Sequence, residues 1–416
     1  MRAHHSGHAL TTQASRGDES PWKWLALLCA AEVGTMLTFS GYAAVLPVLQ
    51  REWGMSAGQA GAVFAAQQLG YTLAVLVLST LTDVWGVRRI YLLSSLWNGL
   101  ANLAFPWLAR DFASAFALRL ICGAGLAGTY MPGMRLVVER FDPQRRGAAV
   151  GLYVACFSVG AAVSLAAAGA LLPWGWRWSF LLPGLGPLAA FALAWRVAQD
   201  PPHKPRAPVR VREVLRNRAA MRYVLAYAAH NWELFGMRAW LSSFLAALWV
   251  AQGVPLSSAA ARGAAFGSVV LLAGAASNAL GGWVSDRAGR RQTAVAVLLA
   301  SAVASCTVGW TLPLGPGVVL PLVLAYGLLV TAESSTLSAA VAESANPRWL
   351  GTTMALQSGL GFVVTAISPA LFGWLLDRAG WGVAFASLGV VALCGALALA
   401  RPQSPGARSH VPDGRT

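Results

Sequence analysis

Long apolar blocks alternate with short polar segments along almost the whole chain. Twelve blocks reach the roughly 20 residues that an α-helix needs to cross the hydrocarbon core of a bilayer. They run approximately over residues 23–46, 59–82, 88–108, 112–138, 146–172, 176–198, 220–250, 261–285, 291–312, 317–342, 349–376 and 381–400. The pattern therefore predicts an all-α membrane protein with twelve transmembrane helices.

The overall composition supports a membrane protein. Hydrophobic residues make up 56% of the chain and charged residues only 11%, and the mean hydropathy is +0.56. Soluble domains carry about 25% charged residues. Because so little polar surface is available to face water, we expect the lipid bilayer to be a principal partner of this chain.

The basic residues are distributed unevenly among the predicted loops. If both termini are cytoplasmic, 24 of the 31 Lys and Arg fall in cytoplasmic segments, 5 fall outside, and Arg119 and Arg238 lie within helices. This asymmetry follows the positive-inside rule. The net charge of +15 is therefore a topology signal and not a nucleic-acid footprint. We expect a multi-pass protein of the cytoplasmic (inner) membrane with both termini inside and no nucleic-acid partner.

The chain contains two copies of one half. Asp83 and Asp286 lie 203 positions apart, and Glu139 and Glu343 lie 204 apart. A single proline-rich, basic stretch separates the copies. Parallel repeats of this kind place the substrate site between the halves near the bilayer midplane. The predicted organisation is a cytoplasmic tail (1–20), a six-helix half (21–198), a cytoplasmic linker (199–219), a second six-helix half (220–400) and a cytoplasmic tail (401–416).

The loop after the eighth predicted helix reads GWVSDRAGRR over residues 282–291. It resembles the signature loop of the major facilitator superfamily, Gly-x-x-x-Asp-Arg-x-Gly-Arg-Arg, at every fixed position. The resemblance implies a transporter in which this loop closes the cytoplasmic face. The gate residues that it implies here are Asp286, Arg287, Gly289, Arg290 and Arg291.

The first copy of the loop is degenerate. It keeps Asp83, Gly86 and Arg88, but valine stands at 84 and 87, where the family has arginine. The sequence therefore leaves open whether the first half has an ionic latch, and it predicts that this copy matters less for gating. Arg135 and Glu139 are i,i+4 neighbours that can pair. With Glu343 as the repeat mate of Glu139, we expect these three residues to belong to a cytoplasmic gate network.

Other segments refine the resemblance. Arg119-x-x-x-Gly123-x-Gly125 is similar to the family's fourth-helix motif, and residues 367–377 to its eleventh helix. The fifth predicted helix lacks the Gly-Pro pair of the family's antiporters, which disfavours drug/proton antiport. Residues 227–240 in the seventh helix resemble the branch of cyanate- and nitrate-type anion permeases.

Six ionisable residues lie deep in the predicted spans, where charge is costly and usually functional. All six fall on helices one, four, seven and ten, which line the cavity in this family. Each has a plainer reading as a structural ion pair or a packing hydrogen bond. The six are Glu32, Arg119, His230, Glu233, Arg238 and Glu333.

These residues suggest how a substrate and a proton would bind. Guanidinium groups pair well with planar anions, so Arg119 and Arg238 are candidates for substrate binding. His230, Trp232 and Trp240 are further candidates, although the tryptophans are equally compatible with packing. A carboxyl group in a low-dielectric site can load and release a proton near neutral pH. Glu233, Glu32 and Glu333 are therefore the candidates for proton coupling.

The sequence thus predicts a secondary active transporter that moves a small organic or inorganic anion by alternating access, coupled to protons. Two alternatives stay open: an exporter of apolar or cationic compounds, and a non-transporting receptor or intramembrane enzyme. No nucleophile motif, nucleotide loop or metal-ligand spacing is present, so we expect no enzyme activity, no cofactor and no metal. The substrate, the direction of transport, the coupling ion and the oligomeric state are left open; a monomer is compatible with the sequence.

Overall fold

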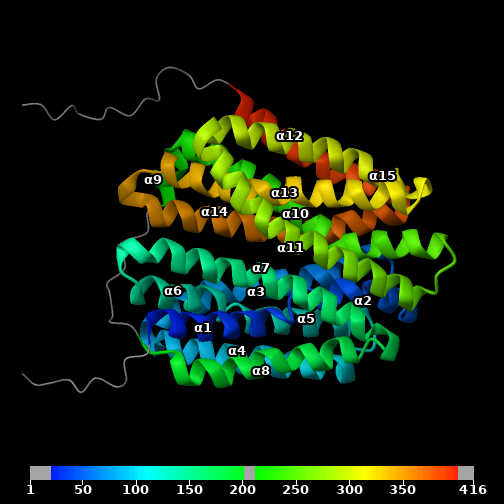
Figure 1. Ribbon diagram of the computed structural model, residues 1–416, viewed down its shortest axis with the longest axis horizontal. Coiled ribbons are helices and arrows are strands. Elements are labelled where there is room, and N and C mark those ends of the chain that lie inside the picture. Colours follow the sequence, from blue (N-terminus) through cyan, green and yellow to red (C-terminus); the bar gives the residue numbers. More distant parts are fainter. Residues whose placement is uncertain (1–19, 201–210, 402–416) are drawn as a thin grey trace, which may run out of the picture.

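The computed structural model describes residues 20–200 and 211–401 (Figure 1). The two predicted tails and the central part of the predicted linker lie outside the described residues. The described residues fold into α-helices and three short 3-10 turns, η1 (Leu172–Trp174), η2 (Leu312–Leu314) and η3 (Pro347–Trp349).

The helices fall into two groups along the chain. The first group comprises α1 (Pro21–Met36), α2 (Gly41–Glu52), α3 (Ala57–Trp85), α4 (Val87–Leu108), α5 (Phe112–Leu126), α6 (Tyr130–Arg140), α7 (Pro143–Leu171) and α8 (Trp178–Val197). The second comprises the short α9 (Val211–Arg216), then α10 (Arg218–Ala251), α11 (Leu256–Ala288), α12 (Arg290–Val308), α13 (Pro316–Ser344), α14 (Leu350–Thr365) and α15 (Ser368–Ala400).

The helices give twelve membrane spans. In the described part of the chain, ten helical segments are long and apolar enough to cross a membrane. The last of these, Pro347–Ala400, has 54 residues and bends sharply at Gly380, where φ is +76°, so it supplies two spans. Helix α4, with 22 residues, completes the set. The predicted all-α, twelve-helix architecture is confirmed.

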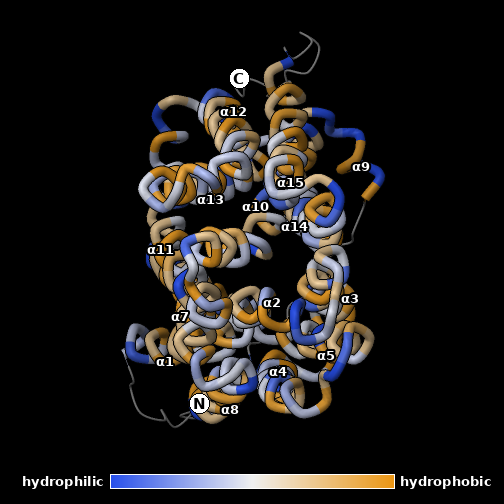
Figure 2. The backbone as a smooth tube through the Cα atoms, turned by 90° about the vertical axis from the view of Figure 1, so that its right-hand side faces the viewer, coloured by the Kyte–Doolittle hydropathy of each residue, from blue (hydrophilic) through white to orange (hydrophobic). Residues whose placement is uncertain are grey.

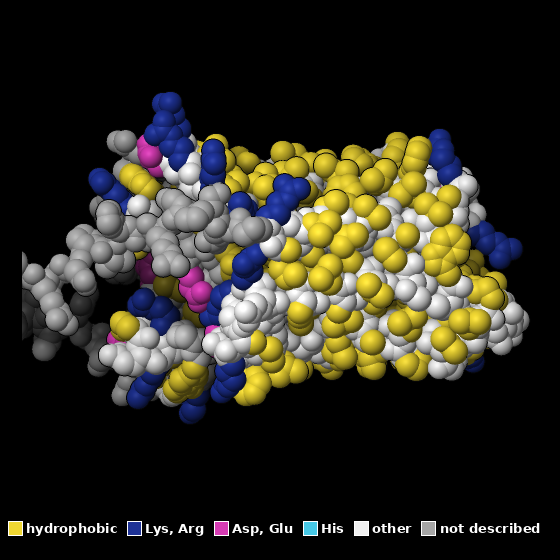
Figure 3. Space-filling model, turned by 90° about the horizontal axis from the view of Figure 1, so that it is seen from above, with side chains coloured by type: hydrophobic (Ala, Val, Ile, Leu, Met, Phe, Trp, Pro, Cys, Tyr) yellow, Lys and Arg dark blue, Asp and Glu magenta, His cyan; other side chains and the backbone are white. Residues whose placement is uncertain are grey.

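The two groups pack as two bundles side by side, α1–α8 in one and α10–α15 in the other (Figures 1 and 2). The start of α1, the end of α15 and α9 lie at the same end of the molecule, which we call the linker end. We call the opposite end the far end. On the face in Figure 3, charged side chains gather at the two ends and an apolar band lies between them, as expected for a surface in contact with lipid.

Two spans of the first bundle are interrupted near their middle. The first span breaks between α1 and α2, and the fourth between α5 and α6. At the first break, the Ser164 hydroxyl on α7 donates to the Leu37 carbonyl (2.6 Å) and accepts from the Ser40 amide (3.1 Å). Within a membrane, interrupted backbone is tolerated where protein groups satisfy it or where it lines a cavity. At the first break, α7 supplies these groups.

The two bundles meet closely at the far end, α3 against α15 and α7 against α11. The carboxylate of Asp377 on α15 accepts hydrogen bonds from the first amides of α3, at 2.8 Å from Ala57 N and 2.9 Å from Gly58 N. A carboxylate at a helix N-terminus is stabilised by the free amides and the helix dipole. Gly61 lies against the Pro369 carbonyl, where a Cβ would collide. The far end is therefore sealed by contacts between the two bundles.

Candidate functional site

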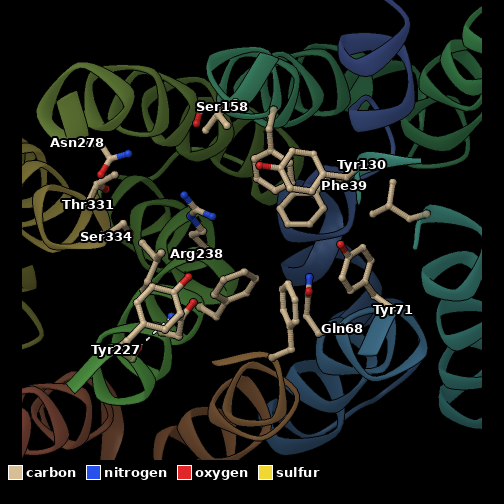
Figure 4. Close-up of a pocket in the computed structure, with 17 residues that line it drawn as sticks. Phe39, Gln68, Tyr71, Tyr130, Ser158, Tyr227, Arg238, Asn278, Thr331 and Ser334 are labelled. Atoms are coloured by element: carbon tan, nitrogen blue, oxygen red, sulfur yellow. Dashed lines mark hydrogen bonds between the residues drawn. The ribbon is translucent and has the colours of Figure 1, made fainter. Parts of the chain in front are cut away.

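A cavity of about 220 Å³ lies between the two bundles, on the linker side of the far-end contacts (Figure 4). The first bundle contributes a largely aromatic wall. Phe39 and Tyr130 come from the two interrupted spans, and Tyr71 and Gln68 come from α3. The breaks in spans one and four therefore place aromatic side chains against the cavity.

The second bundle contributes a more polar wall. Arg238 on α10, Asn278 on α11, and Thr331 and Ser334 on α13 surround one side of the cavity (Figure 4). Arg238 is the single charged side chain among the described residues that line the cavity. Its Nε is buried without a hydrogen-bond partner, and its guanidinium carbon lies 5.5 Å from the centre of the Phe235 ring. A guanidinium in a cavity wall is suited to an anion.

The other five ionisable residues of the spans do not line this cavity, contrary to the expectation that all six belong to it. Glu32, Arg119, His230, Glu233 and Glu333 are each 0% exposed. Their side chains lie in the interior of their own bundle, because the rotation of each helix directs them toward neighbouring helices.

Arg119 is buried in the first bundle without an ionic partner. None of its three guanidinium nitrogens has a hydrogen-bond partner among the described residues. Its guanidinium carbon lies 5.6 Å from the centre of the Tyr42 ring on α2, an arrangement that supports a cation–π interaction. Arg119 and Arg238 therefore differ in whether a ligand can reach them. Arg119 is buried among the helices of its bundle, and Arg238 lies in the cavity wall.

Glu32 is held by two hydroxyls of the first bundle. The Tyr153 hydroxyl donates to Glu32 Oε2 at 2.8 Å, and Thr35 Oγ1 lies 3.4 Å from the same oxygen. The second carboxyl oxygen is buried and has no hydrogen-bond partner among residues 20–200 and 211–401. Glu32 is therefore an isolated buried acid.

The acids of the second bundle form a connected cluster instead. Ser301 Oγ on α12 lies 3.1 Å from Glu233 Oε2 and 2.7 Å from Glu333 Oε1. His230 Nδ1 lies 3.1 Å from Glu333 Oε2, and His230 Nε2 lies 2.5 Å from Ser334 Oγ. Because Ser334 also lines the cavity, the cluster connects the buried acids with the cavity wall.

The two tryptophans proposed from the sequence lie outside the cavity. Trp240 is 1% exposed, donates from Nε1 to the Pro369 carbonyl at 2.9 Å and stacks on Phe372, which places it in the far-end packing. Trp232 is partly buried and is not among the residues that line the cavity, and its Nε1 has no hydrogen-bond partner within the described part of the chain. Of the five predicted substrate-binding residues, only Arg238 is found in the cavity wall.

Several polar residues of the cavity were missed by the sequence analysis. Gln68, Asn231 and Asn278 carry amide side chains within apolar spans, and all three line the cavity. Polar side chains in a membrane span usually face protein or a water-filled space. The polar side chains within the apolar spans were therefore a usable signal, but the prediction considered only ionisable residues.

At the linker end, the second signature loop forms an ionic network. Arg290 lies 2.5 Å from Asp286 and 2.9 Å from Glu343 on α13, and its Nη1 donates to Ser285 Oγ at 2.6 Å. Arg291 donates to the Leu399 carbonyl at 2.7 Å. The network therefore ties the loop to the tenth and twelfth spans of the same bundle.

Two further residues of this loop have distinct environments. Arg287 is exposed and its guanidinium lies 3.8 Å from the centre of the Trp283 ring. Gly289 has φ +91°, and Gly86 in the first copy has φ +88°. Only glycine adopts this backbone without strain, so the matched glycines have a shared conformational cause.

The first signature loop has an ionic network as well, which corrects the doubt raised by its valines. Arg135 on α6 lies 2.7 Å from Asp83 and 2.9 Å from Glu139. The guanidinium of this network therefore comes from Arg135 in the fourth span. The loop itself cannot supply it, because Val87 stands where the second loop has Arg290. Arg88 has another role: its backbone amide donates to the Asp200 carboxylate at 2.8 Å.

Two six-helix bundles around a central cavity, with one charged side chain in the described cavity wall, are typical of a polytopic membrane transporter. The family model of the Major Facilitator Superfamily matches residues 28–368 and 267–416. The chain therefore belongs to the major facilitator superfamily, and the predicted resemblance is confirmed. Family membership also supports a transporter rather than an enzyme.

Three curated relatives illustrate the range of similar proteins. The chain is 25% identical to a probable sulfoacetate transporter of Cupriavidus necator, with 85% of this chain and 86% of that protein covered. It is 24% identical to a probable L-galactonate transporter of Escherichia coli, with coverage of 89% and 87%. It is 32% identical to a puromycin resistance protein of Streptomyces alboniger, but over only 42% of this chain and 35% of that protein.

A solved structure shares the fold. The chain superposes on a bacterial homologue of the human lysosomal transporter Spinster, in its inward-facing and unoccupied conformation, with a TM-score of 0.70 and 17% identity. The match covers 92% of this chain and 95% of that chain. At this identity the likeness establishes the fold alone.

Proposed function

We propose that this protein is a proton-coupled secondary transporter of a small organic anion, with Arg238 as the anchor of the anionic group. The observation that carries the proposal is the guanidinium of Arg238, the single charge on the described wall of the central cavity. Amides and hydroxyls nearby supply hydrogen bonds for the rest of the solute. The relatives named for sulfoacetate and L-galactonate, both acids, support the same substrate class.

The size of the cavity favours a small solute. Pockets for drug-sized ligands occupy roughly 300–1,000 Å³, and this cavity measures about 220 Å³. The alternative, an exporter of cationic compounds, relies on Glu32 and Glu233 as attracting charges. Both carboxyl groups are 0% exposed and lie outside the cavity wall. The geometry therefore supports the anion transporter over the exporter.

We propose that the protein lies in the inner membrane with its linker end facing the cytoplasm, because most Lys and Arg belong to that end. With this orientation the sealed far end makes the conformation inward-facing. Alternating access would then require the Asp377 contact to open while the linker end closes.

The test is binding by the purified protein. A thermal-shift screen of small carboxylates, sulfonates, organic cations and apolar compounds should find stabilisation by anions, because a bound ligand raises apparent stability. Sulfoacetate and L-galactonate are the first probes, followed by uptake into proteoliposomes with a pH gradient. Stabilisation by cations or apolar compounds, with none by anions, would overturn the proposal.

A further inference from the structure

Five side chains form an unbroken chain of polar contacts from the cavity wall into the second bundle. The order is Ser334, His230, Glu333, Ser301 and Glu233, with contacts of 2.5, 3.1, 2.7 and 3.1 Å between successive members. Ser334 is at the cavity surface (Figure 4), and the other four are fully buried. Three helices, α10, α12 and α13, contribute to the chain.

The hydrogen count at Ser301 favours a proton on one of the two acids. The Ser301 hydroxyl has one hydrogen, yet Glu233 Oε2, Glu333 Oε1 and the Leu298 carbonyl all lie within 3.2 Å of Oγ. An ionised carboxylate only accepts hydrogen bonds. Two ionised carboxylates would compete for one hydrogen in a fully buried site, at a high electrostatic cost. One carboxylic acid donating to Ser301 while Ser301 donates to the other carboxylate satisfies both contacts.

The same geometry lets a proton move with the heavy atoms in place. When Glu333 is protonated, its O–H bond breaks as an O–H bond forms on Ser301. The original O–H bond of Ser301 breaks as one forms on Glu233. The reverse step restores the start, so the proton number is conserved and the two acids share one proton through the serine.

His230 extends this path to the cavity. Its two ring nitrogens contact different partners, Ser334 on one side and Glu333 on the other. A proton accepted at Nε2 is balanced by release of the Nδ1 proton to Glu333 Oε2, while the proton on Glu333 Oε1 passes to Ser301 and the Ser301 proton passes to Glu233. The imidazole then returns to neutral, with the proton on the other nitrogen.

The charged and titratable groups around the cluster come from the same helices. Arg238 and Tyr227 share α10 with His230, while Cys306 lies on α12 and Tyr326 on α13 near Glu233. Arg238 is the one fixed charge among them. Its positive charge opposes an imidazolium on His230, so an anion bound to Arg238 would favour proton entry. When the anion and the proton each raise the affinity for the other, their binding is thermodynamically coupled.

We propose that Ser334, His230, Glu333, Ser301 and Glu233 form a proton relay, which loads a proton from the cavity onto a carboxyl pair shared through Ser301. The proposal deepens the proposed proton-coupled function and names the site and its entrance. Glu32 of the first bundle lies outside the relay, with Tyr153 and Thr35 as its partners.

Infrared spectroscopy of the purified protein in lipid nanodiscs tests the relay without any substrate. The rate at which protonated carboxyl bands shift after transfer into D₂O reports proton exchange with water. Glu233→Gln and Glu333→Gln assign the bands. In His230→Gln both bands should exchange more slowly, by roughly tenfold or more if the lost path raises the barrier by at least 1.4 kcal/mol. In Ser301→Ala, Glu333 should exchange at the normal rate and Glu233 slowly.

Two matched variants separate the relay from general loosening. Ser387→Ala removes a partly buried hydroxyl of the same bundle that bonds only within its own helix, to the Ala384 carbonyl, and should leave both bands unchanged. Ser301→Thr keeps the hydroxyl and should restore fast exchange at Glu233. Normal exchange of both bands in Ser301→Ala and His230→Gln would overturn the relay. Because no anion is present, that result would leave the anion-binding proposal standing, whereas failure of the binding screen would leave the relay result intact.

Discussion

The two bundles have matching sequence landmarks, yet their polar chemistry differs. The second bundle has Arg238 in the cavity wall and two glutamates joined through Ser301. The first bundle has Arg119, sealed beneath Tyr42, and Glu32 alone. The two bundles therefore share an arrangement of helices but differ in their charged sites. The rotation of each helix and its neighbouring side chains decide whether a charged side chain reaches the cavity or is buried within the bundle.

The signature loops show the opposite relation, with different sequences and the same chemistry. Each loop has one arginine between two acids: Arg290 between Asp286 and Glu343, and Arg135 between Asp83 and Glu139. In the first bundle the arginine comes from the fourth span because the loop has a valine at that position. Matching the motif residue by residue therefore underestimates the first loop.

The largest expected effect separates the two arginines of the membrane spans, Arg119 and Arg238. Arg238→Ala should reduce anion affinity by about 2–5 kcal/mol, or roughly 30- to several-thousand-fold, because the anion loses its charged partner. Arg238→Lys keeps the charge without the planar fork, so its loss should be smaller. Calorimetric titration of purified variants measures both.

Arg119→Ala is the matched comparison. Since Arg119 does not reach the cavity in this conformation, its removal should alter thermal stability more than affinity. If Arg119→Ala lost anion binding and Arg238→Ala kept it, the assignment of the two arginines would be reversed.

The next effect separates the two buried acids at matching positions of the repeat. With one coupled proton, a pH gradient of one unit supports an accumulation of about tenfold. Glu233→Gln should still bind the anion but let it only equilibrate, because the shared carboxyl pair is broken. Glu32→Gln should keep gradient-driven accumulation. Uptake into proteoliposomes with and without the gradient decides the point, and full accumulation by Glu233→Gln would move the proton site elsewhere.

The third effect concerns the signature loops. Since both loops have an ionic network, Asp83→Asn and Asp286→Asn should both slow transport. The loss should be on the order of tenfold at Asp83, whose partly buried ion pair is worth about 1–2 kcal/mol. It should be smaller at Asp286, whose side chain is 57% exposed and whose pair is worth about 0–1 kcal/mol. Val84→Ala is the control. Because Val84 is 77% exposed, this substitution should change the transport rate little. Transport rates are compared at equal amounts of folded protein. A severe loss for Asp286→Asn alone would restore the view that only the second loop gates.

Much of the fold could be predicted from the sequence, because membrane spans are recognised by their length and apolar composition. The signature loop at 282–291 could also be recognised from the sequence. The residues of the site were harder to predict. A helix turns by about 100° per residue, so a shift of one position decides whether a side chain such as Glu233 faces the cavity or a neighbouring helix. The links through Ser301 and Arg135 join residues far apart in the chain, and no local pattern encodes them.

The smallest expected effect concerns the far-end seal. Asp377→Asn removes the charge that two α3 amides hold, which should shift the balance toward an open far end by about two- to fivefold. Distances between spin labels at positions 51 and 262, exposed residues at this end of opposite bundles, measure the shift. Asp111→Asn is the control, since Asp111 caps its own helix α5 by accepting from Ser114 N at 2.8 Å. Equal distance changes in both variants would refute a specific latch at Asp377.

The most direct test of the central claim is a structure with a bound anion that can be located without ambiguity. A crystal of the wild-type protein soaked with 5-bromo-2-furoate, whose ring-bound bromine does not alkylate the free cysteines, would place the probe by the anomalous signal of its bromine. The account predicts a single strong peak inside the central cavity, with the carboxylate in contact with the guanidinium of Arg238. A peak beside Arg119 with none at Arg238, or bromine found only outside the cavity, would contradict it.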